Sequence, residues 1–178
     1  MIVIKTMKNA DIRRIAEIDR SEHITRAYQY RDGALEMQVV DWQVPSWFPE
    51  GDLEHSLRSK LEAWTPLLEE HDGTLLGAFD GDRMAGFAIY RPRLEGDMAQ
   101  LAVLHVSHDY RRQGIGAALT EQVVRLAVAD GARRLYVSAT PSRSTVEFYR
   151  ARGFELADRV HPDLYEQEPM DIHLIRDL

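Results

Sequence analysis

The chain contains no cysteine. Disulfide bonds, thiolate zinc sites, iron–sulfur clusters and cysteine nucleophiles are therefore excluded, and a reducing compartment is compatible with the composition, so we expect a cytoplasmic protein. A basic surplus is also missing, because 22 lysines and arginines stand against 29 aspartates and glutamates, which gives a formal charge of −7. This balance argues against a nucleic-acid binder or a protein of anionic membrane surfaces. It still allows a small anionic ligand at a local basic patch.

Long hydrophobic runs and repetitive segments are absent as well. No stretch approaches the roughly 18 apolar residues of a membrane span. The short apolar start at Met1–Thr6 is followed by charged residues, unlike a secretory signal. No internal repeat, low-complexity tract or linker rich in Pro, Gly or Ser divides the 178 residues. Because domains usually contain about 100 to 200 residues, we expect one domain over residues 1–178.

A pattern of strands and helices is present, and it is clearest after residue 73. The order strand, helix, strand over residues 97–139 predicts two parallel strands joined by a crossover helix. Residues 20–50 show no clear pattern of secondary structure, although the alternation of apolar residues in Ala34–Trp42 predicts an edge strand. The final two strands are expected to pair antiparallel, and the class is α+β with a mixed, largely antiparallel sheet. The expected strands are Ile2–Thr6, Thr74–Phe79, Met84–Tyr90, Asp97–Val106, Arg134–Ala139, Phe154–Arg159 and Met170–Ile175. The expected helices are a first one capped by Asn9 or Asp11 and ending near Asp19, then Gly51–Glu70, Gly114–Asp130 and Ser142–Arg152.

The most informative segment is the turn Arg111-Arg112-Gln113-Gly114-Ile115-Gly116, between a buried strand and a long helix. Its two glycines let the backbone turn tightly and let a ligand approach the main chain. The first amides of a helix lack intrahelical partners and lie at the positive end of its dipole, so they suit a phosphate. The alternative is that the glycines only shape the turn and the arginines are solvated. A dinucleotide-binding pattern does not fit, because Leu119 stands where its last glycine belongs, and no Gly-Lys-Ser/Thr of a phosphate loop follows.

Two segments together resemble the GNAT superfamily, the CoA-dependent N-acetyltransferases. Leu104-His105-Val106, then four residues, then Arg111 to Gly116 is similar to the family's acetyl-CoA signature, Gln/Arg-x-x-Gly-x-Gly/Ala after an apolar strand. Residues 142–154, with Tyr149 and Gly153-Phe154, resemble the family's helix that ends before Gly-Phe. The resemblance covers a cofactor core at about 74–159, with acceptor-side elements at about 9–70 and 160–170. It implies a single-domain GNAT-like fold with a splayed parallel pair in the sheet and helices on both faces.

The resemblance also implies site residues. Main-chain groups of Leu104, His105 and Val106 would bond the pantetheine arm of acetyl-CoA, and the amides of the turn would hold its pyrophosphate. Tyr149 matches the general acid that protonates the departing CoA thiolate, and the alternative is a core tyrosine packed with its phenylalanine neighbours. The cofactor-binding candidates are Leu104, His105, Val106, Arg111, Arg112, Gln113, Gly114, Ile115, Gly116, Ser142, Thr145 and Arg152. Ser142 stands where the family often has Asn and can equally cap the helix, and Arg152 can equally be a surface residue.

No general base is assigned. Gln100 stands where some relatives carry a base, and glutamine cannot take a proton. His105 points away from Leu104 and Val106 unless a bulge intervenes. Water that passes protons to bulk solvent, or a carboxylate from the N-terminal region, would serve as the base. Acidic and aromatic residues on the acceptor side suit a cationic amine. The alternative is that the acidic residues form a solvated surface and the aromatic residues fill the core. They are Glu17, Asp19, Glu22, Tyr28, Tyr30, Trp42, Trp47, Tyr165, Glu166 and Glu168.

We therefore expect an N-acetyltransferase that moves an acetyl group from acetyl-CoA to a primary amine of a small cationic metabolite, an antibiotic or a peptide. Without a cysteine there is no acyl-cysteine intermediate, so direct attack in a ternary complex is expected. The expected partners are acetyl-CoA or CoA and the amine, with no metal, no nucleic acid and no membrane, and a homodimer is compatible with the sequence. The alternatives are a non-catalytic CoA-binding sensor of the same fold and a nucleotide-binding domain.

Overall fold

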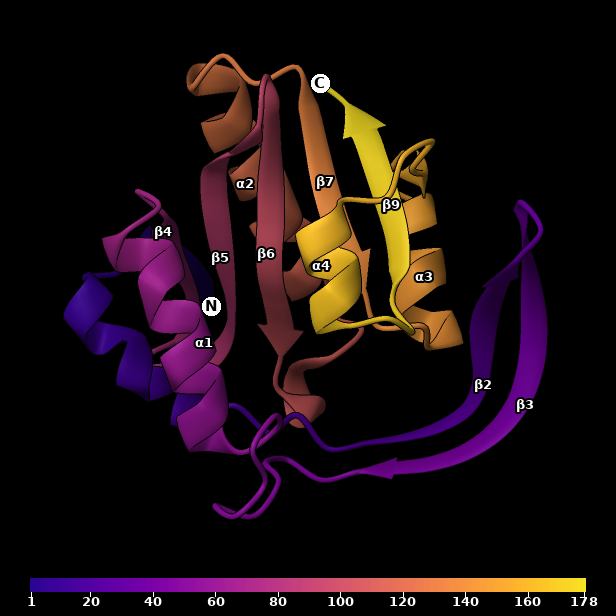
Figure 1. Ribbon diagram of the computed structural model, residues 1–178. Coiled ribbons are helices and arrows are strands. Elements are labelled where there is room, and N and C mark those ends of the chain that lie inside the picture. Colours follow the sequence, from indigo (N-terminus) through magenta and orange to yellow (C-terminus); the bar gives the residue numbers. More distant parts are fainter.

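The computed structural model describes residues 1–178, whose strands form a seven-stranded sheet and a separate two-stranded hairpin (Figure 1). All neighbouring strands of the large sheet are antiparallel except β6 and β7, which are parallel. The mixed, largely antiparallel sheet of the sequence analysis is thus confirmed. In spatial order its strands are β1 (Ile2–Thr6), β4 (Thr74–Asp80), β5 (Arg83–Glu95), β6 (Met98–Val106), β7 (Arg134–Ala139), β9 (Ile172–Asp177) and β8 (Glu155–Leu156).

The parallel pair of β6 and β7 separates along its length. The two strands are paired only from Met98 opposite Arg134 to Gln100 opposite Tyr136. Beyond this point β6 remains paired with β5 as far as Val106, and β7 remains paired with β9 as far as its last residue. The two strands therefore diverge and leave a fork that widens toward their carboxyl ends (Figure 1). The splayed pair is confirmed.

A β-bulge in β6 sets which side chains face each side of the fork. Ile89 of β5 lies opposite Val103, and Tyr90 lies opposite Leu101, so Ala102 is an extra residue in β6. A bulge of this kind shifts the alternation of side chains that follow it. Leu101 accordingly packs in one core cluster, and Val103 in the other.

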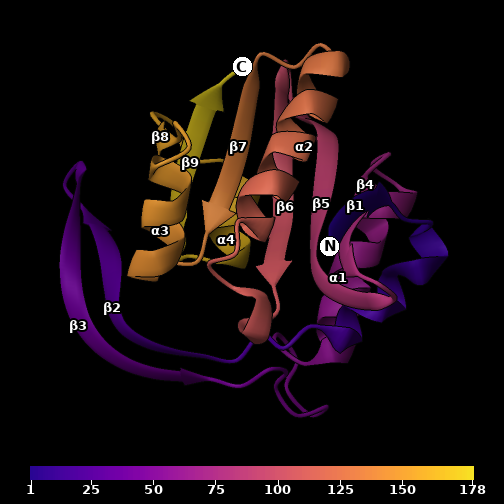
Figure 2. The same cartoon turned by 180° about the vertical axis from the view of Figure 1, so that it is seen from behind.

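Helices cover both faces of the sheet, as expected. The face of the main core cluster carries α2 (Ile115–Ala129) and α3 (Arg143–Arg150), which lie in front of the sheet in Figure 2. The opposite face carries the 3₁₀ helix η1 (Asn9–Glu17), α1 (Leu57–Glu69) and α4 (Pro162–Gln167) (Figure 1). A 3₁₀ turn η2 (His108–Tyr110) follows β6. None of the helices combines the length and the apolar composition that crossing a membrane requires.

Several helix ends differ from the sequence-based expectations. The first helix is 3₁₀ and has no side-chain cap, since Lys8 stands at its N-cap while Asn9 and Asp11 both lie within the helix. The side-chain amide of Asn9 donates to the carbonyl of Leu68. α1 begins later than expected, at Leu57, where the Ser56 hydroxyl accepts a hydrogen bond from the amide of Ser59. The segment 161–169, for which the sequence predicted neither a helix nor a strand, contains the short helix α4.

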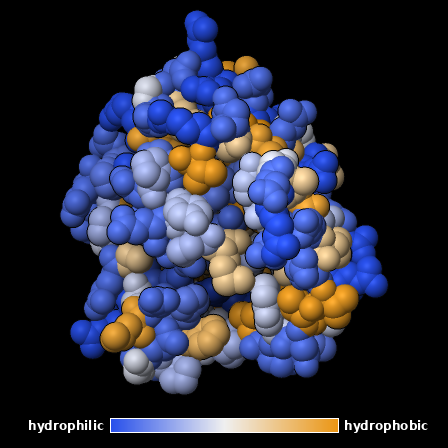
Figure 3. Space-filling model, turned by 45° about the vertical axis from the view of Figure 1, so that its right-hand side comes forward, coloured by the Kyte–Doolittle hydropathy of each residue, from blue (hydrophilic) through white to orange (hydrophobic).

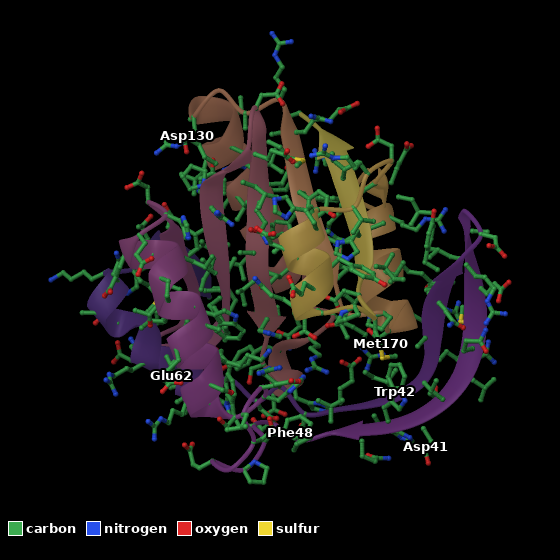
Figure 4. All side chains as sticks on the ribbon, viewed as in Figure 1. Asp41, Trp42, Phe48, Glu62, Asp130 and Met170 are labelled. Atoms are coloured by element: carbon green, nitrogen blue, oxygen red, sulfur yellow. The ribbon has the colours of Figure 1, made fainter.

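The edge strand expected at Ala34–Trp42 is confirmed as β3 (Ala34–Val44), and it lies in a two-stranded sheet apart from the large one. Residues 22–44 form a hairpin, here called the arm, in which β2 (Glu22–Arg31) pairs only with β3. The arm curves along the side of α3 (Figure 1), and the amide of Tyr28 donates to the carbonyl of Pro141 at 2.7 Å. Along β3, Asp41 points away from the body while Trp42 points toward it (Figure 4).

Candidate active site

The fork between β6 and β7 exposes strand edges at the centre of the protein. From Leu101 to Val106 on one bank, and from Val137 to Ala139 on the other, neither strand pairs across the fork. Backbone N–H and C=O groups alternate between the two sides of a strand, so both banks present unpaired polar groups to the fork. An extended ligand with amide groups of its own can bond such edges.

The turn after β6 presents a row of free backbone amides. The amides of Arg112, Gln113 and Gly114 donate to no protein acceptor. The next three, of residues 115–117, belong to the first turn of α2 and have no intrahelical acceptor, since the first helical bond runs from Ala118 to Gly114 at 3.0 Å. Gly114 has a φ of +82°, a conformation that glycine adopts without strain. Consecutive free amides at a helix start form an anion-binding concavity.

The two arginines of the turn have different surroundings. The Arg111 side chain folds back, so that Nε donates to the carbonyl of Val106 and Nη2 to the carbonyl of Arg20, both at 3.2 Å. It also lies 3.8 Å from the Glu22 carboxylate. Arg112 is exposed and forms no ion pair or hydrogen bond through its side chain. The positive charge that faces solvent beside the free amides is therefore that of Arg112.

We expect Arg111→Met to lower the free energy of unfolding by about 2 kcal/mol, because two hydrogen bonds from a charged donor are lost. This corresponds to a fall of roughly 4 to 8 °C in the melting temperature of a chain of this size. Arg112→Met is the matched control and should leave the melting temperature unchanged. Differential scanning calorimetry of both variants is the measurement. Equal melting temperatures for the two variants would contradict a structural role of Arg111.

Tyr149 lies in α3 with its ring in the core and its hydroxyl unbonded. The ring makes edge-on contacts with Phe148 and Phe154, at centroid distances of 5.1 and 5.3 Å, and the residue is 6% exposed. The hydroxyl makes no hydrogen bond to a protein group. Burial raises the pKa of Tyr149, the negative charge of Asp171 raises it further, and the positive charge of Arg152 partly opposes both. The phenol therefore stays protonated and remains a proton donor throughout the neutral range.

Three other sequence candidates, in α3 or beside its ends, are engaged with protein groups. The Ser142 hydroxyl, in a residue only 1% exposed, accepts from the amide of Thr145 at 3.3 Å and donates to the Thr145 hydroxyl at 2.8 Å. Arg152 donates to the carbonyl of Phe148 at 2.7 Å and covers its ring at 3.7 Å. The Ser142 hydroxyl therefore caps the start of α3 through its bonds to Thr145, and the Arg152 side chain stacks on the ring of Phe148. A Cβ added to Gly116 would lie 3.2 Å from Phe148, so the start of α2 and α3 are in close contact.

On the other face of the sheet, β6 offers no ready proton acceptor. His105 lies between Trp64 and Phe87, with ring centroids at 5.9 and 5.6 Å, on the side opposite Leu104 as expected. Burial lowers the pKa of His105 well below its usual value, and nearby positive charges lower it further. Gln100 is 4% exposed, and its carbonyl oxygen is buried without a hydrogen-bond partner.

A carboxylate that the sequence analysis missed lies on the β7 bank. Ser138 donates a 2.8 Å hydrogen bond to Oδ2 of Asp171, the residue that precedes β9. Its other oxygen, Oδ1, accepts no hydrogen bond from the protein. Burial raises the pKa of Asp171 from 3.8 to about 6, against the effect of the Ser138 hydrogen bond. No local signal marks this aspartate, because its burial comes from elements distant in sequence.

The raised pKa of Asp171 predicts a pH-dependent stability. The folded protein holds this proton more tightly than the unfolded chain, so ionisation destabilises the fold. The penalty is absent below about pH 4, grows from pH 4 to 6 and is complete above pH 6. We therefore expect Asp171→Asn to be more stable than the wild type by about 1 to 2 kcal/mol at pH 8, after allowing for partial exposure, and to lose most of this advantage at pH 4.5. Urea unfolding of both proteins at the two pH values measures the difference in stability. A difference that does not change with pH would contradict the prediction.

The other acceptor-side acids are mostly engaged with cations. Glu17 pairs with Arg14 at 2.6 Å and accepts from the amide of Met84, away from the fork. Glu168 pairs with Lys60 at 3.3 Å and lies near Asp171. The surface is hollowed where the arm meets the body, and apolar residues border this hollow (Figure 3). Trp42 of the arm points toward the segment before β9 that carries Met170 (Figure 4).

Comparison with known protein families decides the relationship. The model of the Acetyltransferase (GNAT) family matches residues 37–154, about two thirds of the chain, and includes the fork, the turn and α3. The chain belongs to the GNAT acetyltransferase family. The resemblance drawn from the motifs is thus confirmed. No protein of curated function matches this GNAT sequence.

Solved structures similar to this GNAT protein share its fold over nearly the whole chain. Nourseothricin acetyltransferase is 18% identical with a TM-score of 0.73, and the match covers 99% of this chain and 98% of that one. The putative streptothricin acetyltransferase from Bacillus anthracis str. Ames, in complex with acetyl coenzyme A, is 14% identical with a TM-score of 0.70, covering 98% and 96%. PaiA N-acetyltransferase from Thermoplasma acidophilum, in complex with coenzyme A, is 14% identical with a TM-score of 0.60, covering 100% and 99%.

Proposed function

We propose that this protein transfers an acetyl group from acetyl-CoA to a primary amine by direct attack in a ternary complex. The observation that carries the proposal is the convergence of three features on the fork. Its banks present unpaired strand edges, the free amides of the turn follow the end of β6, and Tyr149 lies in the helix packed against that turn. This combination suits a long phosphorylated ligand with a reactive group at its inner end.

The residues present fit acetyl-CoA. Main-chain groups of Leu104, His105 and Val106 bond the pantetheine amides, and the free amides of Arg112 to Gly116 receive the pyrophosphate, because the amide of Arg111 already donates to the carbonyl of His108. Arg112 adds positive charge there, whereas Ser142, Thr145 and Arg152 act through the shape of α3. Solved relatives of this fold in complex with acetyl coenzyme A and coenzyme A support the assignment.

Tyr149 is the proposed general acid. When the amine nitrogen attacks the thioester carbonyl, the C–S bond breaks with its electron pair on sulfur, and the phenol donates its proton to that sulfur. The chain has no cysteine, so no acyl-cysteine intermediate forms and the amine attacks the thioester directly.

The proposed acceptor is a cationic amine. Aromatic and acidic side chains line its approach: Trp42 faces the body, and Asp171 and Glu168 lie by the fork. Aromatic faces and carboxylates both favour cations. Two of the similar structures carry names of antibiotic acetyltransferases, for nourseothricin and streptothricin, which makes an antibiotic amine the first acceptor to test.

The test is release of CoA thiol from acetyl-CoA in the presence of single amines, followed by mass spectrometry of the amine. The panel contains nourseothricin, polyamines, amino acids and short peptides. We expect at least one cationic amine to accelerate release and to gain an acetyl group. Binding of CoA without acceleration by any amine would favour the CoA-binding sensor. A larger thermal shift with ATP or NAD than with CoA would favour the nucleotide-binding domain.

A further inference from the structure

The proposed reaction requires a group that takes a proton from the acceptor nitrogen, and the fork offers three side chains to compare. Gln100 and His105 come from β6, and Asp171 precedes β9 beside β7. The inference that follows rests on the proposed function, because it concerns a step of that reaction.

Gln100 and His105 are both unsuitable. An amide side chain has no basic site that can hold a proton at neutral pH. His105 is desolvated, and the charges of Arg20, Arg111 and Lys60 all act against its protonation. A proton moved to this imidazole would add a fourth positive charge to a group of three. His105 therefore stays neutral and serves the packing of Trp64 and Phe87.

Asp171 has the geometry of a proton acceptor. Its hydrogen bond comes from Ser138, which lies beyond the last residue of β7 that pairs with β6, so the carboxylate is tied to the open part of the fork. The bond fixes Oδ2 and leaves Oδ1 free. Asp171 is also close enough to Tyr149 for its charge to raise the pKa of the phenol. The proposed acid and this carboxylate therefore belong to one site.

None of the charged and titratable groups around Asp171 competes with it as the acceptor of the proton. The negative charge of Glu168, after α4, raises the pKa of Asp171, and the positive charge of Lys60 in α1 lowers it. These two residues pair with each other at 3.3 Å. Tyr149 of α3 is protonated, and burial lowers the pKa of His173 on the following strand, so that ring is neutral as well. No cation forms an ion pair with Asp171 itself.

We propose that the free oxygen of Asp171 accepts the proton that the acceptor nitrogen loses as it is acetylated. The amine reacts in its neutral form, whose nitrogen lone pair forms the N–C bond, and the C–S bond breaks with its electron pair on sulfur. Tyr149 gives its proton to sulfur, and the nitrogen gives its proton to Asp171. The products are the amide and the CoA thiol. The proton on Asp171 then returns to the Tyr149 phenolate through solvent, which restores both groups.

The protonation state of Asp171 suits this role. With its pKa raised to about 6, the carboxylate is ionised at neutral pH and is more basic than a solvated aspartate. As the N–C bond forms, the nitrogen becomes positively charged and its proton becomes acidic, so transfer to this carboxylate is favourable.

The test compares Asp171→Asn with the wild type, using the best amine of the thiol-release panel. Asparagine keeps the shape and an acceptor for Ser138 but cannot take a proton. We expect kcat/KM at pH 7.5 to fall roughly 30-fold, slightly less than a positioned base usually contributes, because water can partly replace it. In the wild type, kcat/KM should fall as the pH drops below about 6, and this acidic limb of the pH profile should disappear in Asp171→Asn. The dissociation constant for CoA should stay unchanged. The matched control is Asp163→Asn, an exposed aspartate of α4 without a hydrogen bond to another residue, which should keep both the rate and the limb.

The contrary outcomes are distinct. Retention of the wild-type rate and of the acidic limb by Asp171→Asn would overturn the proposal. A rise in KM with unchanged kcat and limb would also overturn it, since Asp171 would then only attract the cation. A wild-type protein that releases no thiol with any amine would refute the proposed function itself. An active wild type with an unaffected Asp171→Asn variant would refute only the inference about Asp171.

Discussion

Replacing Tyr149 by phenylalanine should lower kcat for acetyl transfer about 10³-fold, within the range that a positioned proton donor contributes. The ring packs between Phe148 and Phe154, and phenylalanine preserves these contacts. The hydroxyl bonds no protein group, so its removal leaves none unpaired and should not lower stability. Steady-state kinetics at saturating acetyl-CoA measure kcat, and calorimetry measures the affinity for CoA, which should change by less than about twofold.

Tyr90→Phe is the matched control for Tyr149→Phe and should behave in the opposite way. Tyr90 lies in the same core cluster, is 1% exposed, and donates a 2.9 Å hydrogen bond to Asp130 at the end of α2. Its loss should lower the free energy of unfolding by about 1 to 2 kcal/mol and leave kcat unchanged. If instead Tyr149→Phe retains kcat and loses stability, Tyr149 is a core tyrosine and another group protonates the thiolate.

The cofactor half of the site could be predicted from sequence because its determinants are local. The strand before the turn, the glycines and the helix after it occupy residues 97–130 without interruption. Gly114 adopts the left-handed conformation that a glycine at a strand-to-helix turn indicates. The boundaries of β6 and α2 agree with the predicted ones to within one residue, since the apolar run of β6 and the helical periodicity of α2 are both strong.

The acceptor half was predicted poorly because its order depends on distant contacts. β2 buries only Ile24 and Ala27 and pairs with β3 outside the large sheet, so it lacks the apolar alternation by which a strand is predicted. α4 is six residues long and begins at a proline, too short for helical periodicity to be visible. A short helix and a hairpin of this kind become ordered only against a body that is already folded.

The same distinction applies to single side chains. The sequence placed Arg111 and Arg112 together as phosphate ligands, but two of the three partners of Arg111, Arg20 and Glu22, are about 90 positions earlier in the chain. Asp171 has a raised pKa only because β7, α1 and α3 enclose it. Chemistry that follows a backbone motif could be predicted, whereas chemistry that follows from burial by distant elements could not.

Replacing Gly114 by valine should raise the dissociation constant for CoA about 10²-fold. A β-branched residue does not tolerate the φ of +82° found there, so the turn must change its path. The amides of residues 112–117 then no longer point to one place. Each hydrogen bond to a charged group contributes about 1.5 to 3 kcal/mol, so the loss of two accounts for an effect of this size. Isothermal titration with CoA measures it directly, without a need for the acceptor.

Gly131→Val separates this loss from ordinary backbone strain. Gly131 lies just beyond the other end of α2 with a φ of +79°, and an added Cβ at Gly114 or Gly131 would meet no atom within 4 Å. Both variants should therefore lose similar stability, on the order of 1 to 2 kcal/mol, in urea unfolding. Only Gly114→Val should lose affinity for CoA, because the helix end near Gly131 carries carbonyl groups and the opposite dipole. Equal CoA affinities of the two variants would show that the amides of the turn do not hold the pyrophosphate, whatever the family membership of the chain.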